Sequence, residues 1–584
     1  MNKSNTRGFA PQSEWKRTDW RKLERTVFKL QNRIYRASQR GDVRVVRKLQ
    51  KTLMKSWSAK MLAVRKVTQQ NKGKKTAGID GKKALTSKRR LTLVANLKLY
   101  KKPQPTCRVW IDKPGRKEKR PLGIPTIHDR ALQALTKQVL EPEWEARFEP
   151  NSYGFRPGRS CHDAIQAIFS SINQMPKWVL DADISKCFDK INHDALLTKL
   201  NTYPSMRRLI KGWLKAGVID EGTFSPTDEG TPQGGIISPL LANIALHGME
   251  KRIKEYAETL PSKYGVSKSH KRKALSLIRY ADDFVIMHKS KEVVEECQRI
   301  INKWLKDIGL ELKPNKTKLV HTSNGFDFLG FNVRQYPVGK NQSKQGFKTL
   351  IKPSKKKVKE HWEQLSNAID RHKAAPQKAL IRHLKPIIRG WCNYNRSVVS
   401  KETFSSLDNM LWNKLQRWGY RRHPNKSKTW VNKKYWGTKV EKPKNPWDAP
   451  KVDNWVFMTE EDNYLPKHAK TEIVRHVKVK ESRSPFDGDL IYWSARMQKH
   501  PEMTSSIGKL LKRQEGKCAH CGLTFRDGDL IEKHHILPRS LGGSDHYKNL
   551  ELLHLHCHDA KHGKKIDSLT VGHATRTELD DNPF

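Results

Sequence analysis

The chain has 584 residues, more than one hydrophobic core usually organises, so several domains are expected. Its 115 lysines and arginines against 59 aspartates and glutamates give a formal charge of +56, which predicts a polyanionic partner. No apolar run of about 18 residues exists to span a bilayer, and the first twenty residues lack the apolar stretch of a secretory signal. We therefore expect an intracellular protein without a membrane partner.

The N-terminal half divides into three parts by its patterns. Residues 1–70 are basic, and apolar positions recur every three or four residues, which predicts an amphipathic helix pair whose basic face either grips RNA or is merely solvated. Turn-rich residues 71–125 predict loops and short strands. Between 126 and 335, helical stretches alternate with two strand-like apolar runs, which predicts an α+β catalytic domain; the runs are KWVLDADISKCF and LSLIRYADDFVIMH.

The C-terminal half begins near residue 345 with basic, helical and tryptophan-rich sequence. A proline-rich stretch at 441–450 resembles a linker. The final unit begins near residue 506 and contains a cluster of cysteines and histidines, the only place where the eight cysteines gather. A local metal site is therefore favoured over disulfides.

The strongest chemical signal is RYADDF, in which Asp282 and Asp283 separate two apolar runs. Strand, acidic turn and strand would form a hairpin with carboxylates at its tip, although aspartate is common at turns for local reasons. A second apolar strand ends at Asp183. Nucleotidyl transfer needs two divalent ions held by hard carboxylate oxygens, and aspartates from different strands would supply them.

The chain resembles group II intron-encoded reverse transcriptases in a series of motifs that occur in the family's order: PLGIPTIHDRALQ, NSYGFRPGRSCHDAI, DADISKCFD, GTPQGGIISPLLANI, RYADDF, LELKPNKTKLVHT and FDFLGF. The resemblance implies a right-hand polymerase with fingers, palm and thumb. It also implies that Asp183 and Asp282 are the principal Mg²⁺ ligands, with Asp283 beside them.

The same resemblance suggests residues that meet the substrate. Phe188 would crowd a ribose 2′-hydroxyl so that deoxynucleotides are preferred; the alternative is a core aromatic. Gln233 and Gly234 lie where little side-chain bulk lets the backbone approach nucleotide and template. Lys113 and Arg120 could hold the triphosphate of a dNTP by charge-assisted bonds, or could be solvated loop cations.

The tryptophan-bearing basic region, residues 385–436, resembles the maturase (X) domain of the family, which binds intron RNA and helps it to splice. Its tryptophans could stack on bases while its cations neutralise phosphates. Alternatively, the aromatics form a small helical core under solvated cations. The family carries a DNA-contacting region before its last domain, where the segment SPFDGD looks like a family marker and not a catalytic site.

The C-terminal unit has the spacing of a structural zinc site, with two pairs of ligands about thirty residues apart. Cys518 and Cys521 form the first pair, and His554 and Cys557 form the second, with His554 where many relatives have cysteine. A complete four-ligand shell would hold Zn²⁺ without leaving a position for water.

Between and after those pairs, the sequence resembles an HNH endonuclease, a ββα-metal unit. His535 would be the general base, since an imidazole titrates near neutrality. The resemblance assigns a catalytic divalent ion to His534, His558 and His562, and an orienting or loop-bracing role to Asn549. The alternative is a nuclease-derived zinc module that only binds DNA.

Together these features predict a multidomain α+β protein that combines a right-hand polymerase, a helical maturase domain, a DNA-binding region and an HNH zinc domain. The N-terminal extension and the start of the fingers would occupy residues 1–90, and the fingers and palm would occupy 91–340. The thumb and maturase domain would follow at 341–440, the linker and DNA-binding region at 441–505, and the endonuclease at 506–584.

The expected function is intron mobility: RNA-directed DNA polymerase, splicing maturase and DNA-strand endonuclease in target-primed reverse transcription. Its partners would be intron RNA, a DNA target and primer, and dNTPs, in the cytoplasm or nucleoid of a bacterium or in an organelle. Whether a homodimer forms stays open. The rivals are a splicing cofactor without required catalysis, and a retron or diversity-generating reverse transcriptase.

Overall fold

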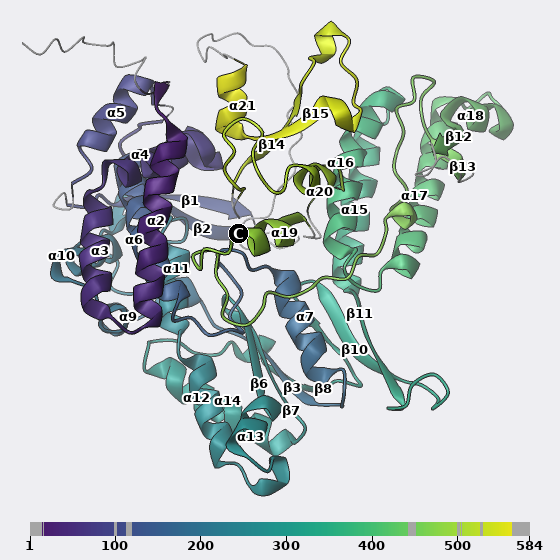
Figure 1. Cartoon of the computed structure of the whole chain (residues 1–584). Coiled ribbons are helices and arrows are strands. Elements are labelled where there is room, and N and C mark those ends of the chain that lie inside the picture. The colour runs from purple at the N-terminus through teal and green to yellow at the C-terminus, as the bar shows by residue number, and fades with distance from the viewer. Residues whose placement is uncertain are drawn as a thin grey trace, which may run out of the picture.

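The computed structural model gives the positions of most of the chain, and Figure 1 shows its course. It describes residues 15, 17–83, 85–98, 102–112, 119–441, 451–498, 503, 505–525 and 529–562. Among these residues, none of the helices is both long enough and apolar enough to cross a membrane.

The N-terminal helical prediction is confirmed, and the described residues from 17 onward contain α2, α3 and α4 in place of a pair. Each begins at a side chain that caps it: Asp19, Asp42 and Ser56 accept hydrogen bonds from backbone N–H groups three residues on. Their apolar faces pack against α6 (Ile127–Glu145). The elements before the first strand are α2 (Trp20–Gln39), α3 (Val43–Lys55), α4 (Trp57–Arg65), η1 (Lys66–Gln70), η2 (Lys72–Lys75) and α5 (Ser87–Ala95).

A first sheet follows, in the part of the chain where short strands are predicted. Its order is β2-β1-β4-β5, and β1 pairs antiparallel with β2 but parallel with β4. The strands are β1 (Thr106–Asp112), β2 (Lys119–Ile124), β4 (Val218–Asp220) and β5 (Thr223–Ser225). Helix α5 was not expected, because the turn-forming residues around it mask its apolar spacing.

The two strand-like apolar runs form the centre of a second sheet, in the order β6-β7-β3-β8 with antiparallel neighbours. The strands are β3 (Trp178–Asp183), β6 (Ser276–Tyr280), β7 (Asp283–His288) and β8 (Lys318–His321). β7 is apolar without alternation because both of its faces are buried: Phe284 and Ile286 pack in a cluster with α14 (Lys291–Lys306), and Val285 and Met287 pack in a second cluster with α7 (Cys161–Ile172).

Further elements complete this half of the chain, and α7 and α12 contact β6 (Figure 1). They are α7 (Cys161–Ile172), α8 (Cys187–Lys190), α9 (His193–Leu200), α10 (Pro204–Leu214), α11 (Ser238–Leu246), α12 (Met249–Thr259), η3 (Ser262–Tyr264), α13 (Lys268–Ala274) and η4 (Pro314–Lys316).

A three-stranded sheet leads from the second sheet into a helical unit with its own core, which includes Leu365, Leu384 and Trp418. A β-hairpin, β12–β13, closes the unit and spans the boundary predicted at residue 440. The elements are β9 (Phe326–Phe328), β10 (Phe331–Pro337), β11 (Phe347–Pro353), α15 (Lys355–Arg371), α16 (Gln377–Asn395), α17 (Lys401–Arg422), α18 (Lys428–Tyr435), β12 (Trp436–Glu441) and β13 (Lys451–Phe457).

After η5 (His468–Lys470), residues 474–489 form a segment that we call the strap, which leads into α19 (Leu490–Gln498). The strap returns across the catalytic half of the molecule to α2 (Figure 1). There the Asn32 amide donates to the Phe486 carbonyl at 2.8 Å. Within SPFDGD, Asp487 accepts a hydrogen bond from the Trp493 indole, so this segment is a structural anchor.

The last unit has the predicted ββα arrangement. β14 (Ile531–His535) and β15 (Leu550–His554) pair antiparallel, and α21 (Leu555–Lys561) follows directly. The remaining elements are α20 (Ser505–Arg513), η6 (Arg539–Leu541) and η7 (Tyr547–Asn549).

Candidate active sites and metal centres

The acidic hairpin forms as predicted. Tyr280 pairs with Asp283, so Ala281 and Asp282 make a two-residue turn between β6 and β7. Ala281 has φ 57°, the left-handed conformation that such tight hairpin turns use. The turn presents Asp282 at the tip and Asp283 as the first residue of β7.

The register of the second sheet brings Asp183 to the same place. Asp183 at the end of β3 is the direct partner of Asp283 in β7. The next residue, Ile184, donates its backbone N–H to the Asp282 carbonyl at 3.2 Å. Directly opposite residues have Cβ atoms roughly 5 Å apart, so three carboxylates meet at one end of the sheet.

The electrostatics of this cluster favour a cation. Burial, with the nearby charges of Asp282 and Asp183, raises the pKa of Asp283 to about 7. Burial and the charge of Asp183 likewise raise the pKa of Asp282. Carboxylates that disfavour one another's charge are stabilised when a divalent ion binds between them, and hard oxygens are the ligands that Mg²⁺ prefers. The residues therefore fit a magnesium site.

Lys316 is a member of this site that the sequence reasoning did not single out. Its ammonium forms an ion pair with Asp183 Oδ2. Lys316 lies in η4, just before β8, and the pairing of β8 with β3 carries it to the carboxylates. Its motif, LELKPNKTKLVHT, contains three lysines, and only the tertiary structure distinguishes this one.

The residues predicted to contact the substrate have different surroundings. Phe188 lies on α8, half-buried against the core, with its ring 5.9 Å from that of Phe155. Arg120 lies on β2. Burial raises the pKa of Asp282, and the positive charge of Arg120 partly offsets that rise. Lys113 lies outside the described residues.

Gly234 of the TPQGG loop lies where the backbone conformation and a close neighbour both exclude a side chain. Gly234 has φ 110°, and a Cβ atom there would lie 2.9 Å from the Gly123 carbonyl oxygen of β2. Gln233 accepts a backbone hydrogen bond from Gly123 at 2.6 Å, and its side-chain amide donates to Asp189 at 3.3 Å. The loop thus joins the first sheet to α8 close to the aspartates.

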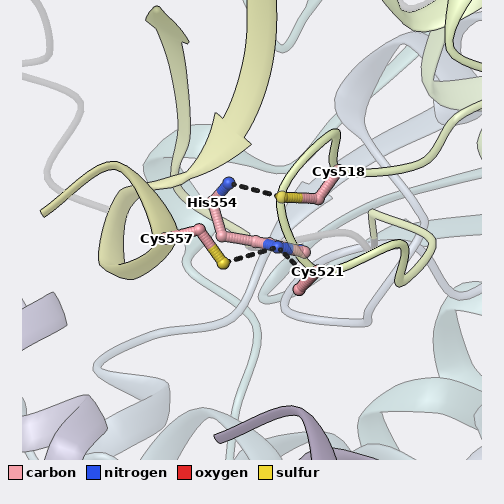
Figure 2. Close-up of side chains that lie close together, drawn as sticks. All are labelled: Cys518, Cys521, His554 and Cys557. Atoms are coloured by element: carbon pink, nitrogen blue, oxygen red, sulfur yellow. Dashed lines mark hydrogen bonds between the residues drawn. The ribbon is translucent and has the colours of Figure 1, made fainter. Parts of the chain in front are cut away.

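The four predicted zinc ligands converge from a loop, β15 and α21 (Figure 2). Their ligand atoms lie within 4.8 Å of one another, and all four residues are buried. His554 Nδ1 is 3.4 Å from Cys521 Sγ and 4.0 Å from Cys557 Sγ. Ligand atoms around a tetrahedral zinc ion lie roughly 3.5 Å apart, so these side chains fit Zn²⁺.

A carboxylate supports this cluster from outside. Asp529 Oδ2 lies 3.4 Å from His554 Nε2, the ring nitrogen that faces away from the cysteines. Such a contact fixes the orientation of a metal-binding imidazole. Sequence reasoning did not select Asp529, because it lies outside both ligand pairs.

The second histidine cluster also assembles as predicted. His534 of β14 and His558 and His562 at α21 offer ring nitrogens that lie close enough to share one metal ion. His562 Nε2 is 2.9 Å from His534 Nδ1. These three histidines offer only nitrogen ligands, and the cluster is partly exposed. A metal ion bound there could keep a coordination position open to substrate or water.

His535 and Asn549 have distinct surroundings. His535 Nε2 lies 2.7 Å from Asp545 Oδ1. Hydrogen bonds from Arg539 and then His535 lower the pKa of Asp545 to about 2, so this residue is a carboxylate near neutral pH. The sequence reasoning did not identify Asp545, which lies in the loop between β14 and β15. Asn549 bridges that loop with bonds of 2.8 and 3.0 Å to the Leu537 backbone.

Four family models match successive parts of the chain. They are the N-terminal domain of reverse transcriptase at 15–97, reverse transcriptase (RNA-dependent DNA polymerase) at 111–333, the group II intron maturase-specific domain at 358–436, and HNH endonuclease at 518–564.

Protein YkfC of Escherichia coli is 33% identical over 333 residues, a match that covers 50% of this chain and 84% of that protein. Group II intron-encoded protein LtrA of Lactococcus lactis is 33% identical over 327 residues, covering 45% of this chain. The chain belongs to the group II intron-encoded reverse transcriptase and maturase family. Its match spans about half of LtrA, 53% of that protein's length.

Among solved structures, apo telomerase from Candida tropicalis matches 44% of this chain and 61% of that chain, at 14% identity and a TM-score of 0.32. The multidomain fold predicted from the sequence, with reverse transcriptase, maturase and HNH domains, is confirmed by the family matches and the described elements.

The maturase unit uses its aromatics mainly as core. Trp418 and Trp436 are buried in that core, while Trp430 and Trp455 are 38% and 57% exposed. Arg422 is also structural, since its guanidinium donates to the Lys373 carbonyl at 2.8 Å. The predicted helical core of aromatics is therefore confirmed, and stacking of exposed tryptophans on RNA bases stays a prediction.

Proposed function

We propose that the chain is a group II intron mobility protein: an RNA-directed DNA polymerase, splicing maturase and DNA-strand endonuclease that acts in target-primed reverse transcription. The observation that carries the proposal is the convergence of Asp183, Asp282 and Asp283 at one end of the second sheet, inside the region that matches reverse transcriptases. The complete HNH histidine cluster in the same chain supports the endonuclease role.

In the polymerase, Asp183 and Asp282 would hold two Mg²⁺ ions, with Asp283 beside them. Bound Mg²⁺ supplies activation of the primer 3′ oxygen and neutralisation of the leaving pyrophosphate. The protein holds carboxylates of raised pKa in place, so that cation binding recovers the cost of their mutual repulsion.

Further residues would select and position the dNTP. Phe188 would restrict the ribose, and Gln233 with Gly234 would line the nucleotide site. Arg120, whose charge already reaches Asp282, would bind the triphosphate together with Lys113.

In the endonuclease, His535 would take a proton from water while Asp545 orients the imidazole. His534, His558 and His562 would hold the catalytic cation, and Asn549 would brace the loop between the strands. Cys518, Cys521, His554 and Cys557 would hold Zn²⁺ in a closed structural shell.

The test is a reciprocal pair of variants of the full chain. Asp282→Ala should abolish Mg²⁺-dependent primer extension on RNA, while cleavage of target DNA by the assembled ribonucleoprotein persists. His535→Ala should keep primer extension and bound zinc but slow cleavage by about a hundred- to ten-thousandfold. Each variant is thus the folding control for the other.

Full primer extension by Asp282→Ala would refute the polymerase assignment. If both variants lost their reactions yet supported intron splicing and mobility as the wild type does, the splicing-cofactor alternative would replace the proposal.

A further inference from the structure

A hollow of about 470 Å³ lies between α18 and the β12–β13 hairpin, far along the chain from either catalytic cluster. Its lining combines two tryptophans, two asparagines, two threonines, a lysine and a glycine: Thr429, Asn432, Lys433, Trp436, Gly437, Thr438, Asn454 and Trp455. Large apolar rings beside amide, hydroxyl and ammonium groups match the chemistry of a nucleotide, which presents a flat base, polar base edges and a phosphate.

Trp455 lies in a β-bulge of the β12–β13 hairpin. The pairing runs from Gly437↔Val456 to Lys439↔Asp453, so β13 contains one more residue than β12 at this point. Trp455 there has φ 57°, a conformation that bulky residues seldom adopt. Bulges commonly redirect a side chain, and such backbone strain gathers at binding sites.

The Trp455 ring is exposed and yet positioned. It is 57% exposed, while Trp412 packs against it at a centroid distance of 5.7 Å and an interplanar angle of 90°. Trp412 also contacts Trp436, the buried tryptophan of the lining, at 5.1 Å. A ring supported in this way offers apolar surface to a base at little cost in side-chain freedom.

Two asparagines of the lining offer amide groups that can pair with a base edge. Asn432 Oδ1 is buried and has no hydrogen-bond partner within the described part of the chain. A buried acceptor without a donor costs about 1–3 kcal/mol, so a bound group that donates to it would be favoured. The Thr438 hydroxyl donates to Asn454 Oδ1 at 3.1 Å, which orients the second amide.

The surrounding charge suits a polyanion. Lys433 lines the hollow, and Lys439 stands over the Tyr464 ring together with Lys385 of α16. Burial and the neighbouring charges of Arg389 and Lys439 lower the pKa of Lys385, as expected where cations crowd without enough anions. Cations of α16 also line a second hollow, and one of them, Lys385, shares the Tyr464 ring with Lys439 of β12.

We propose that this hollow binds one unpaired nucleotide of structured RNA, with the base against Trp455 and its edge at Asn432. The inference rests on the proposed maturase function and adds to it a specific binding site for one looped-out base. RNA is favoured over duplex DNA because proteins recognise structured RNA largely through splayed, unstacked bases, and the base pairs of a duplex could not enter the hollow.

The experiment uses full-length protein whose polymerase site is filled with excess primer–template duplex. Its probes are a fluorescein-labelled twelve-nucleotide oligouridylate, the DNA oligonucleotide of the same length, and a blunt RNA duplex. Trp455→Ala should weaken oligouridylate binding about tenfold or more, and Asn432→Leu should weaken it too. Trp455→Phe should restore most of the affinity, since it keeps an aromatic face.

Trp430→Ala is the matched control, because Trp430 is an exposed tryptophan of the adjacent α18 outside the lining. It should change affinity less than twofold, and duplex RNA binding should be the same for all variants. Equal effects of Trp455→Ala and Trp430→Ala, or none from Trp455→Ala, would overturn the proposal. A larger loss for the DNA oligonucleotide than for RNA would reassign the hollow to DNA. Wild-type protein that bound the RNA duplex but not oligouridylate would overturn the proposal alone, whereas wild-type protein that bound none of the probes would overturn it together with the maturase function.

Discussion

Replacing Asp163 with asparagine should release the strap from the reverse transcriptase half of the molecule. Asp163 is fully buried near the start of α7. Its Oδ1 accepts hydrogen bonds from His476 at 3.1 Å, from the Val479 backbone at 2.8 Å, and from Arg496. One carboxylate therefore joins α7 to both the strap and α19.

The expected cost follows from this burial. Asparagine keeps the shape but removes the negative charge, leaving Arg496 next to a neutral group. Removing one member of a buried ion pair typically costs about 3–5 kcal/mol, which corresponds to a rise of roughly a hundredfold to several thousandfold in the open population of the strap. By contrast, Asp489→Asn changes an exposed pair with Arg483 and should cost less than about 1 kcal/mol.

Hydrogen exchange measures this opening directly, at the backbone N–H of Val479 and its neighbours. Asp163→Asn should lose protection there while the N-terminal helices keep theirs, and Asp489→Asn should resemble the wild type. Equal loss of protection in the two variants would refute the argument, because burial would then not decide the strength of the contact.

The same carboxylate predicts a pH dependence. Burial alone would raise the pKa of Asp163, but hydrogen bonds from His476 and the charge of Arg496 outweigh it and hold that pKa well below its usual range. A depressed carboxyl pKa contributes stability that is fully present above the unfolded value, about 3.9, and is lost as the pH falls below it. Acid should therefore loosen the strap in the wild type, whereas this contribution is already missing in Asp163→Asn.

Four further predictions concern the other sites. Cys518→Ala should lose bound zinc by atomic absorption and become protease-sensitive after residue 505, because metal binding and folding of such a unit are coupled; retention of zinc would contradict the closed shell. Asn549→Ala should keep zinc but slow DNA cleavage by about tenfold to a hundredfold, since its loop loses three hydrogen bonds. Gly234→Ala should impair primer extension far more than Gly222→Ala, because both have positive φ but a Cβ atom at Gly222 meets no atom within 4 Å; equal effects would show that φ alone matters. Arg421→Ala, at an exposed position, should lower the salt dependence of RNA binding by about one phosphate contact, and an unchanged slope would exclude that contact.

Patterns in the sequence were enough to predict most of the catalytic elements and the residue types of the candidate sites, although α5 was missed. Apolar spacing of three and four predicted the N-terminal helices, and two apolar runs predicted β3 and the β6–β7 hairpin, because these patterns reflect which side of each element is buried. Residue type and close spacing likewise selected the aspartates, the cysteine pairs and the HNH histidines, since a metal site limits its ligands to a few kinds of side chain.

Contacts between residues far apart in the sequence could not be predicted, because they depend on strand register and on packing between elements. Asp183 and Asp283 are a hundred residues apart in the chain, and the register of β3 against β7 places them opposite one another. Lys316 and Asp545 entered their sites in the same way, through strand pairing and a loop, with no local pattern to mark them. Long-range packing also buried Trp418 and left Trp455 exposed, because the side that faces the core depends on neighbours far away in sequence.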